Sequence, residues 1–458
     1  MSTKHILKTR DDKACVEFVD SGEEGNFKLV ENADCSWMAG GTEFGSDKLR
    51  PRIEPWLTSL FQSEHLALLA GSGLSHAVHC IATGNLLPGM SQATFTNYNA
   101  AIADKARESA KLAGRNAGNI EDQIRVVNEL IRGIEILSSQ ELTLKESLKS
   151  LRSELKIVLA NFADSVLKGE NGLITAPSEK REKAFNYLVS FLMSFASRTG
   201  MRDRLQVFTT NYDRFIEAGA DAAGLHLIDR FVGSLAPIFR SSRLDIDMHY
   251  NPPGIRGEPR YLEGVARFTK LHGSLDWIST EGQIRKIGLP FGSEEIAPYL
   301  KAPGLSDGEA LNLMIHPNAA KDRETAAYPY VELFRDFAAA VCRPNSTLIS
   351  FGYSFGDEHI NRVIKDMLTI PSTHLVVIAY GDPLGRIMQT YVELGRSAQI
   401  TMLIGAHLGD LRNLVDNYMP KPAIDRTTFK MSELLKSRWG ISQAESAPQT
   451  PEPDSANE

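Results

Sequence analysis

Apolar residues form several short continuous runs along the chain, and each run ends in small or polar residues. The runs are 66–70 (LALLA), 204–213 (RLQVFTTNYD), 346–354 (STLISFGYS) and 374–382 (HLVVIAYGD). Strands covered on both faces read as continuous apolar runs, whereas half-exposed strands alternate. The helical pattern EHINRVIKDML lies between the last two runs, and this strand–helix–strand order indicates βαβ units. The pattern therefore predicts an α/β fold with a parallel sheet, closed by a short last strand, QITMLIG.

A periodicity of three and four residues dominates the region from about 100 to about 200. In NIEDQIRVVNELIRGIEIL, one helix face collects the apolar residues Ile120, Ile124, Val127, Leu130, Ile131 and Ile134. The same spacing returns at Leu144, Leu148, Leu151 and Leu155, and again in KAFNYLVSFLMSFA. This predicts a large helical insertion between the first strand and the next. Its wide apolar stripe is expected either to contact other subunits or to pack against the sheet.

The two ends of the chain lack these patterns. Residues 1–53 contain Gly-rich pieces, SGEEGNF and MAGGTEFG, and are predicted to form an N-terminal arm or a small subdomain. The main domain is predicted at 54–420, beginning with the short helix PWLTSLFQS, and a C-terminal helix at 421–442. The tail at 443–458 is rich in Pro, Ser and acidic residues without apolar periodicity, so we expect it to be disordered.

Composition narrows the class of protein. The 458 residues are 42% hydrophobic and 23% charged, which is typical of a globular protein. The net charge is −7, and because phosphate contacts need a surplus of Lys and Arg, strong nucleic-acid binding by this chain is not expected. The N-terminus lacks the apolar region of a signal peptide, and no apolar stretch has the length of a membrane span. We therefore expect a cytoplasmic protein.

The cysteines and histidines give little support for a metal site. The chain contains four cysteines, Cys15, Cys35, Cys80 and Cys342. No two form a C-x-x-C pair, which argues against both a zinc knuckle and a disulfide framework. His76 and His79 could approach each other on a helix beside Cys80, but no third ligand is evident. The prediction is a fold with no zinc module and no bound metal.

Unusual residues follow the predicted strands. The segments are GSGLS (71–75), TTNYD (209–213), KLHGS (270–274), GYSFGDEHIN (352–361) and GAH (405–407). In an open parallel sheet, ligands bind beyond the carboxyl ends of the strands. Each segment alone also has a purely structural interpretation, such as a tight strand-to-helix turn for GSGLS or an Asx turn for TTNYD. Their occurrence together, in this order, favours a binding site.

The GSGLS segment combines conformational freedom with a possible helix start. Gly71 and Gly73 permit a close approach that a Cβ would forbid. If a helix begins at Ser75, its free N–H groups would favour an anion such as a pyrophosphate. In the fourth segment, Asp357 is predicted to cap a helix, and His359 either opens that helix or lines the site.

Together these segments resemble the sirtuin-like NAD-binding domain, whose patterns are G-A-G-x-S, T-Q-N-x-D, H-G and G-T-S. The corresponding residues are Gly71-Ser72-Gly73-Leu74-Ser75, Thr210-Asn211-Tyr212-Asp213, His272-Gly273-Ser274 and Gly352-Tyr353-Ser354-Phe355. The resemblance covers most of residues 60–415 and implies a Rossmann-like sheet. The segments FTTNYD, KLHGSLDW and FGDEHINR resemble those of bacterial antiphage sirtuin-like proteins, especially the type encoded beside a HerA-family ATPase/helicase.

Three departures separate the chain from the protein deacylases of that family. SHAVHCIATG stands where deacylases have a G-I-P-D-F-R segment, the four zinc cysteines are absent, and Thr210 replaces the Gln of T-Q-N. The resemblance therefore implies an NAD+ hydrolase (NADase) that depletes NAD+ in antiphage defence. Two alternatives stay open: a protein deacylase or ADP-ribosyltransferase, and a non-catalytic sensor of NAD or ADP-ribose.

The resemblance also implies a role for each matching residue, with NAD+ as the substrate and no metal required. Asn211 would bind the nicotinamide-side ribose and position water, His272 would act as general base, and Asp213 would support this loop or the carboxamide. The other implied NAD contacts are Gly71, Ser72, Gly73 and Ser75 around the pyrophosphate, Thr210, and Gly352 and Ser354 at the adenosine ribose. Asn211 and His272 together argue against a sensor, because a pure binder needs no base.

For partners, the resemblance implies a homo-oligomer docked on a HerA-family ATPase. An NADase that was always active would kill its own host, so its activity must be conditional. The N-terminal arm and the helical insertion are the candidate control elements, and the acidic net charge suits a division of labour in which the ATPase handles DNA.

Overall fold

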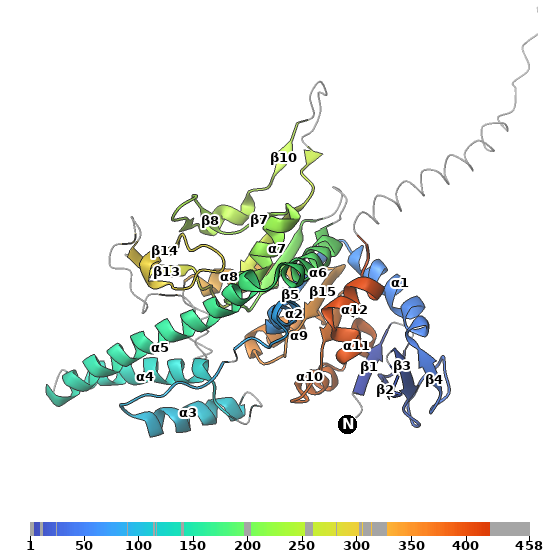
Figure 1. The fold of residues 1–458 in the computed structure, drawn as a ribbon, viewed down its shortest axis with the longest axis horizontal. Coiled ribbons are helices and arrows are strands. Elements are labelled where there is room, and N and C mark those ends of the chain that lie inside the picture. Colours follow the sequence, from blue (N-terminus) through green and yellow to red (C-terminus); the bar gives the residue numbers. More distant parts are fainter. Residues whose placement is uncertain are drawn as a thin grey trace, which may run out of the picture.

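A computed structural model gives the fold of the chain (Figure 1). It describes residues 4–421 except for 10–11, 24, 89, 113–114, 116, 139–141, 197–202, 252–259, 281, 302–304, 306–312 and 314–327. The predicted C-terminal helix, apart from its first residue, and the predicted disordered tail lie outside the described residues. No helix in the described ranges has the length and apolar character needed to cross a bilayer.

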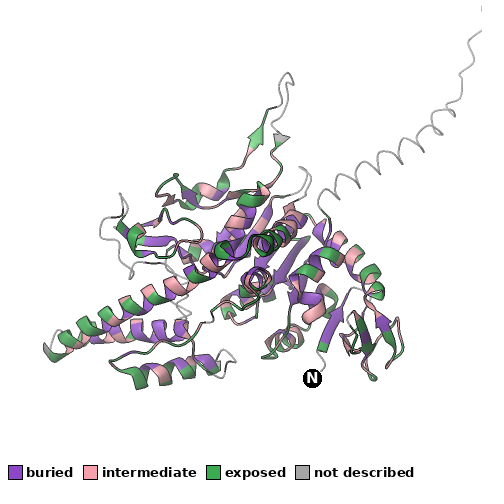
Figure 2. Cartoon of the chain, viewed as in Figure 1, coloured by how far each residue is buried: buried purple, intermediate pink, exposed green. Residues whose placement is uncertain are grey.

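Parallel strands form the centre of the largest sheet, as the continuous apolar runs predict. In sheet order they are β17 (Ile400–Ile404), β16 (His374–Ala379), β15 (Ser346–Phe351), β5 (His65–Ala70), β6 (Leu205–Thr209), β12 (Val265–Lys270) and β7 (His226–Ile228). Every neighbouring pair in this series is parallel. All six residues of β15 are buried, because helices cover both faces of the sheet (Figure 2). The predicted α/β fold with a Rossmann-like parallel sheet is confirmed.

The order of the strands defines a switch point. β5 lies between β15 and β6. On one side the chain runs from β5 to β6, then to the edge strand β7 and back to β12 between them. It then crosses back and runs outward through β15, β16 and β17 on the other side. Open α/β sheets bind ligands where the strand order reverses in this way, outside the carboxyl ends of the strands. The segments 71–75, 210–213 and 352–357 all follow strands at this point.

The N-terminal residues extend the same sheet. They form β1 (Lys4–Lys8), β2 (Val16–Asp20), β3 (Asn26–Leu29) and β4 (Glu43–Gly45), which are joined in antiparallel order. β1 pairs with β17, also antiparallel. In β2 and β3 buried residues such as Phe18 and Phe27 alternate with more exposed ones, so these short strands give no continuous apolar run. The segment predicted as an N-terminal arm or a small subdomain therefore extends the main sheet at its edge.

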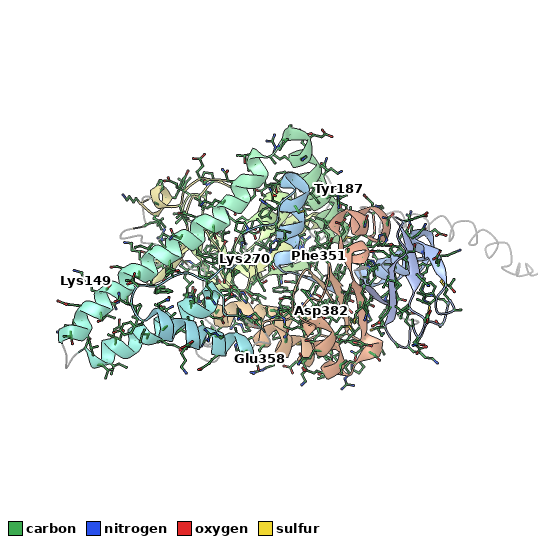
Figure 3. All side chains as sticks on the ribbon, turned by 60° about the horizontal axis from the view of Figure 1, so that its bottom comes forward. Lys149, Tyr187, Lys270, Phe351, Glu358 and Asp382 are labelled. Atoms are coloured by element: carbon green, nitrogen blue, oxygen red, sulfur yellow. The ribbon has the colours of Figure 1, made fainter. Side chains whose placement is uncertain are left out.

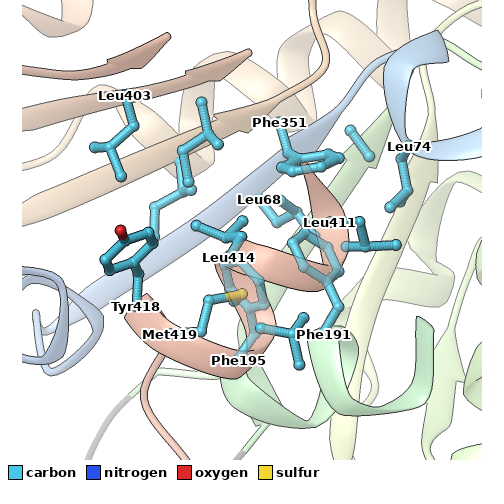
Figure 4. Packing of buried hydrophobic residues seen from close by; sticks show 14 of the residues in the cluster. Leu68, Leu74, Phe191, Phe195, Phe351, Leu403, Leu411, Leu414, Tyr418 and Met419 are labelled. Carbon is cyan, nitrogen blue, oxygen red and sulfur yellow. The ribbon is translucent and has the colours of Figure 1, made fainter. Parts of the chain in front are cut away.

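Helices pack on both faces of the sheet, and successive side chains of each strand point to opposite faces. Leu68 and Ala70 of β5 belong to one apolar cluster, and Ala67 and Leu69 belong to the other. The first face is covered by α1 (Arg50–Phe61), α2 (Ser72–Thr83), α6 (Ser178–Ala196), α7 (Phe215–Ala223), α11 (Ala406–Gly409), α12 (Leu411–Asn413) and a π-helical turn, Leu414–Tyr418. Figure 4 shows Phe191, Phe195 and Tyr418 packed there against the strands. The second face is covered by α8 (Tyr330–Val341), α9 (Glu358–Met367) and α10 (Arg386–Leu394).

The predicted helical insertion divides into two parts. Its first three helices, α3 (Asn99–Leu112), α4 (Ile120–Leu137) and α5 (Leu142–Thr175), form a separate layer with its own apolar cluster. α5 projects well beyond the sheet, and Lys149 marks its far end in Figure 3. α6, by contrast, packs against α2 and α7 on the sheet. The predicted stripe residues of α4 are largely buried within this layer against α5, so the stripe itself gives no support for subunit contacts.

Short elements complete the described chain, and the sequence patterns do not predict them. β8 (Phe231–Val232), β9 (Ile238–Phe239), β13 (Trp277–Thr280) and β14 (Gln283–Lys286) form a small second sheet. β10 (His249–Tyr250) and β11 (Arg260–Tyr261) form a two-stranded ribbon. The 3-10 turns are Ser46–Lys48, Ser241–Asp245, Ala297–Lys301 and Ser397–Gln399.

Candidate active site

A cavity of about 680 Å³ opens beyond the carboxyl ends of the central strands. One wall comes from the loops after β5, β6, β12 and β15, and the other comes from the α3–α5 layer. Nine of the ten residues singled out from the sequence line it: Gly71, Ser72, Ser75, Thr210, Asn211, Asp213, His272, Gly352 and Ser354. The tenth, Gly73, is not part of the wall. Four of the five sequence segments therefore meet in one place, as the strand-end argument predicts, whereas GAH (405–407) does not line the cavity.

Two glycine turns pack directly against each other at the base of this cavity. A Cβ on Gly71 would lie 2.4 Å from the carbonyl oxygen of Gly352, and a Cβ on Gly73 would lie 2.6 Å from the Cα of Gly352. The Gly73 N–H also donates to that same carbonyl, at 3.0 Å. Gly352 itself has a φ of +63°, which side chains rarely tolerate. All three glycines therefore allow the two turns to pack closely against each other.

The helix that follows the first turn begins earlier than the sequence suggests. α2 starts at Ser72, with Gly71 in an extended N-cap conformation, whereas we expected a start at Ser75. The reason is that the contact with Gly352 lets the chain enter the helix directly from β5. Ser72 thus lies in the first helical turn and faces the cavity, and Ser75 lies one turn further in and is buried.

Asn211 ties the loop after β6 to the loop after β5. Its side-chain amide donates to the carbonyl oxygen of Gly71 at 3.0 Å and to the hydroxyl of Ser75 at 2.9 Å. The backbone N–H of Asn211 donates to the hydroxyl of Thr209 at 3.1 Å. Ser75 in turn forms a hydrogen bond with the carboxylate of Asp213. Asn211 is 6% exposed, so this network fixes it rigidly at the cavity wall.

Asp213 sits in a strongly charged setting. Burial raises the pKa of Asp213, and the positive charge of Lys270 opposes that rise. Lys270 is buried and its ammonium group donates to Glu217 at 3.0 Å and to the backbone carbonyl of Asp213. The last residue of β12 therefore holds the backbone of the loop after β6. Lys270 belongs to the KLHGS segment noted in the sequence, but the sequence analysis assigned it no role.

His272 forms a pair with Asp357, whose carboxylate accepts a hydrogen bond from Nε2 at 2.9 Å. Asp357 also caps α9 by accepting the N–H groups of His359 and Ile360, which confirms the predicted cap. Burial lowers the pKa of His272, but the hydrogen bond and charge of Asp357, with the charge of Glu121, outweigh it and raise the pKa. Burial works against ionisation of Asp357 as well, yet His272 holds its pKa at about 2.

These shifts link the pair to stability in a defined direction. Asp357 contributes stability above the ordinary aspartate pKa, and this contribution is lost as the pH falls towards about 2. His272 contributes stability below the ordinary histidine pKa, and this contribution is lost as the pH rises through its raised pKa. The pair is therefore strongest at mildly acidic to neutral pH.

The α3–α5 layer adds residues that the sequence reasoning missed. Glu121, in the first turn of α4, accepts a hydrogen bond from the Tyr212 hydroxyl at 3.0 Å. Burial raises the pKa of Glu121, and the charge of His272 and the hydroxyl of Tyr212 oppose part of that rise. A capping box between Asn119 and Asp122 starts α4 and thereby aims its first turn at the cavity. That N-x-x-D pattern was the available sequence signal.

A buried ion pair fastens the loop after β6 to the inserted layer. Glu170 on α5 is fully buried and accepts the backbone N–H of Arg214 at 2.9 Å. Its carboxylate also accepts two hydrogen bonds from the guanidinium of Arg214, at 2.6 Å from Nη2 and 3.1 Å from Nε. Because Arg214 directly follows Asp213, this pair sets the path of the backbone at the site.

The possible metal ligands do not come together. His79 turns its Nδ1 towards the carbonyl of Gly169 on α5, at 3.1 Å, and burial lowers the pKa of both His76 and His79. All four cysteines are free thiols. Within the described ranges, no group of three His, Cys, Asp or Glu side chains is arranged around a common point that could hold a metal ion.

Comparison with known proteins agrees with this geometry. Residues 205–395 match the family model of the SIR2-like domain, a span that runs from β6 to the end of α10. The match supports a Sir2-like fold in this part of the chain and points to the NAD-dependent enzyme superfamily. A search of curated proteins found no match. The matched span contains Asn211, His272 and Asp357, while β5 and the Gly71 turn lie before it.

Proposed function

We propose that the chain hydrolyses NAD+ to nicotinamide and ADP-ribose. The observation that carries the proposal is the His272–Asp357 pair, which lies in the same cavity wall as Asn211 and Asp213. A histidine that is held by a carboxylate and faces a cavity can accept a proton near neutral pH. This combination is more than binding alone requires.

The cavity fits a dinucleotide. Its volume of about 680 Å³ lies within the range of small-molecule sites. The backbones of Gly71 and Gly352, which pack against each other, form part of its wall. Next to it, the N-terminus of the 12-residue helix α2 favours a phosphate group, and the exposed Ser72 supplies a hydroxyl close by.

The chemistry asked of the chain is limited because nicotinamide is already a good leaving group. Cleavage of its glycosidic bond passes through an oxocarbenium-like state, as in glycoside hydrolysis. Asp357 accepts the Nε2 hydrogen of neutral His272, so Nδ1 carries the lone pair that can accept a proton from water or a ribose hydroxyl. Asn211 and Asp213 hold the loop on which the ribose would rest. The α3–α5 layer on the opposite wall favours a small acceptor such as water over a protein substrate.

The direct test is incubation of the purified full chain with NAD+ and separation of the products by HPLC. We expect nicotinamide and ADP-ribose in equal amounts. Transfer of an acyl group from an acetylated peptide, or of ADP-ribose to protein, would identify the deacylase or transferase alternative. Tight binding of NAD+ without any product would identify a sensor.

The pH dependence of the reaction should report on Asp357. In Asp357→Asn the hydrogen bond and negative charge that raise the pKa of His272 are weakened, so burial lowers that pKa. The acid limb of kcat/KM should therefore move to lower pH, while the maximal rate falls by about tenfold or more because the imidazole is less well held. We would measure kcat/KM between about pH 5 and about pH 9. An unchanged acid limb in this variant would contradict the pairing, and Glu393→Gln, on the exposed side of α10, serves as the control.

We further propose that this NADase is a cytoplasmic effector of antiphage defence that works with a HerA-family ATPase. The support is the resemblance of the segments FTTNYD, KLHGSLDW and FGDEHINR, together with a net charge of −7 that leaves DNA contacts to a partner. A large homo-oligomer is expected in solution, with weak DNA affinity and NAD+ turnover that changes when the ATPase is added. Light scattering at micromolar concentration tests this, and a monomer both alone and with the ATPase would refute the assembly.

A further inference from the structure

Two arginines face the cavity at one end of its wall. Arg386 is the first residue of α10, and Arg115 lies in the segment between α3 and α4. The guanidinium of Arg386 lies over Gly356, so closely that a Cβ there would be 2.9 Å from Nη1. Arg115 is fixed by two bonds to the Asp122 carboxylate, at 2.8 and 2.9 Å. Burial lowers the pKa of Arg386 and the nearby positive charge of Arg115 lowers it further, so the two cations share one region.

The proposed function decides which half of the substrate lies beside these arginines, and the inference rests on it. The bond to be broken joins nicotinamide to its ribose, so that end must lie at Asn211 and His272, beyond β6 and β12. The adenosine half must then extend across β5 to the loops after β15 and β16. Gly356 and Arg386 lie on those two loops.

Two carboxylates on these loops are used for other purposes, and Glu358, the first residue of α9, also lines the cavity. A site that selects an unphosphorylated ribose commonly places a carboxylate on its 2′-hydroxyl, whereas an arginine there accommodates a 2′-phosphate. Asp357 caps α9 and holds His272. Asp382 accepts the N–H groups of Ile387 and Met388 at the start of α10. This end of the cavity also carries two guanidiniums, Arg386 and the Asp122-bound Arg115, and guanidiniums match the geometry and charge of a phosphate.

We propose that Arg386 and Arg115 form a phosphate subsite for the 2′-phosphate of NADP+. The chain then takes the 2′-phosphorylated dinucleotide in preference to NAD+, cleaving the same glycosidic bond. The subsite brings together one cation from the sheet domain and one from the inserted layer, so it exists only when the layer covers the cavity.

Binding of the stable products tests this without turnover. The full chain would be titrated by calorimetry with ADP-ribose and with 2′-phospho-ADP-ribose at fixed ionic strength. We expect the phosphorylated ligand to bind about tenfold or more tightly, because charge-assisted Arg–phosphate bonds are among the stronger contacts. The ratio of the affinities for 2′-phospho-ADP-ribose and ADP-ribose should fall to near unity in Arg386→Ala. It should also fall strongly in Arg115→Gln. Arg396→Ala, an exposed arginine just beyond α10, should keep it.

Each other outcome has a defined meaning. Equal affinity of the wild-type chain for both ligands overturns the subsite. A loss of affinity in Arg386→Ala that is equal for both ligands also overturns it, since the arginine would then contact the pyrophosphate. If neither ligand binds and neither dinucleotide is consumed, the proposed function fails and not only the subsite. Unfolding midpoints of the variants, measured alongside, show whether a lost preference reflects a lost fold.

Discussion

Replacing His272 with alanine is expected to slow NAD+ loss by about 100- to 10,000-fold, the usual contribution of a positioned general base. The variant removes the imidazole that Asp357 holds at 2.9 Å, while Asp357 keeps its bonds to the N-terminus of α9. The fold should therefore survive. The measurement is the initial rate of nicotinamide release by HPLC at saturating NAD+.

Two further variants sharpen this test. Asn211→Ala should also abolish NAD+ loss, and because it removes the bonds to Gly71 and Ser75 it should lower the unfolding midpoint slightly. His226→Ala, on the exposed edge strand β7, should leave the rate unchanged. A His272→Ala protein that consumes NAD+ at the wild-type rate would remove the histidine from the mechanism.

Breaking the buried pair between Glu170 and Arg214 should give the largest loss of stability. In Glu170→Ala the guanidinium of Arg214 stays buried without its carboxylate, which typically costs about 3–5 kcal/mol of unfolding free energy. Activity should fall as well, since Glu170 also accepts the backbone N–H that follows Asp213. Urea unfolding followed by circular dichroism would measure the free energy.

The control for this prediction is a solvent-exposed ion pair on the surface of the protein. Arg107→Ala removes the exposed pair with Asp104 on α3 and should change the unfolding free energy by less than about 0.5 kcal/mol. The double variant Glu170→Leu/Arg214→Leu should lose less than Glu170→Ala, because it leaves no buried charge unpaired. If Glu170→Ala unfolds at the same urea concentration as Arg107→Ala, the pair contributes little.

The sheet could be predicted well where burial gives a clear pattern. β5, β15 and β16 are covered on both faces, so their apolar runs are continuous and their positions follow within a few residues. β2 to β4 were missed as sheet strands because they are short and partly exposed, and the buried β1 was missed because it is short and contains His5 and Lys8. Only the pairing of β1 with β17 makes these strands part of the sheet. No local pattern contains that pairing.

The site could be predicted in part for a related reason. Residues at strand ends meet because the topology gathers those ends, and this placed Asn211 and His272 at one cavity. The partner of His272 could not be found in this way. The sequence shows that Asp357 caps a helix, but only the folded structure shows that Asp357 also bonds His272. Likewise, the period of α4 shows that one face is buried but not that Glu121 reaches Tyr212.

The contact between the turns at Gly71 and Gly352 has a consequence for how the protein folds. Ser346 on β15 pairs with His65 on β5, so the strands that meet there come from distant parts of the chain. Closing so long a loop costs entropy before any contact forms, which makes the assembly of this centre a late event. A fragment limited to residues 205–395 lacks β5 and would leave β6 and β15 without the strand between them. Ligand bound at the centre would thus stabilise only the completely folded chain, and its effect on the unfolding midpoint would report on global folding.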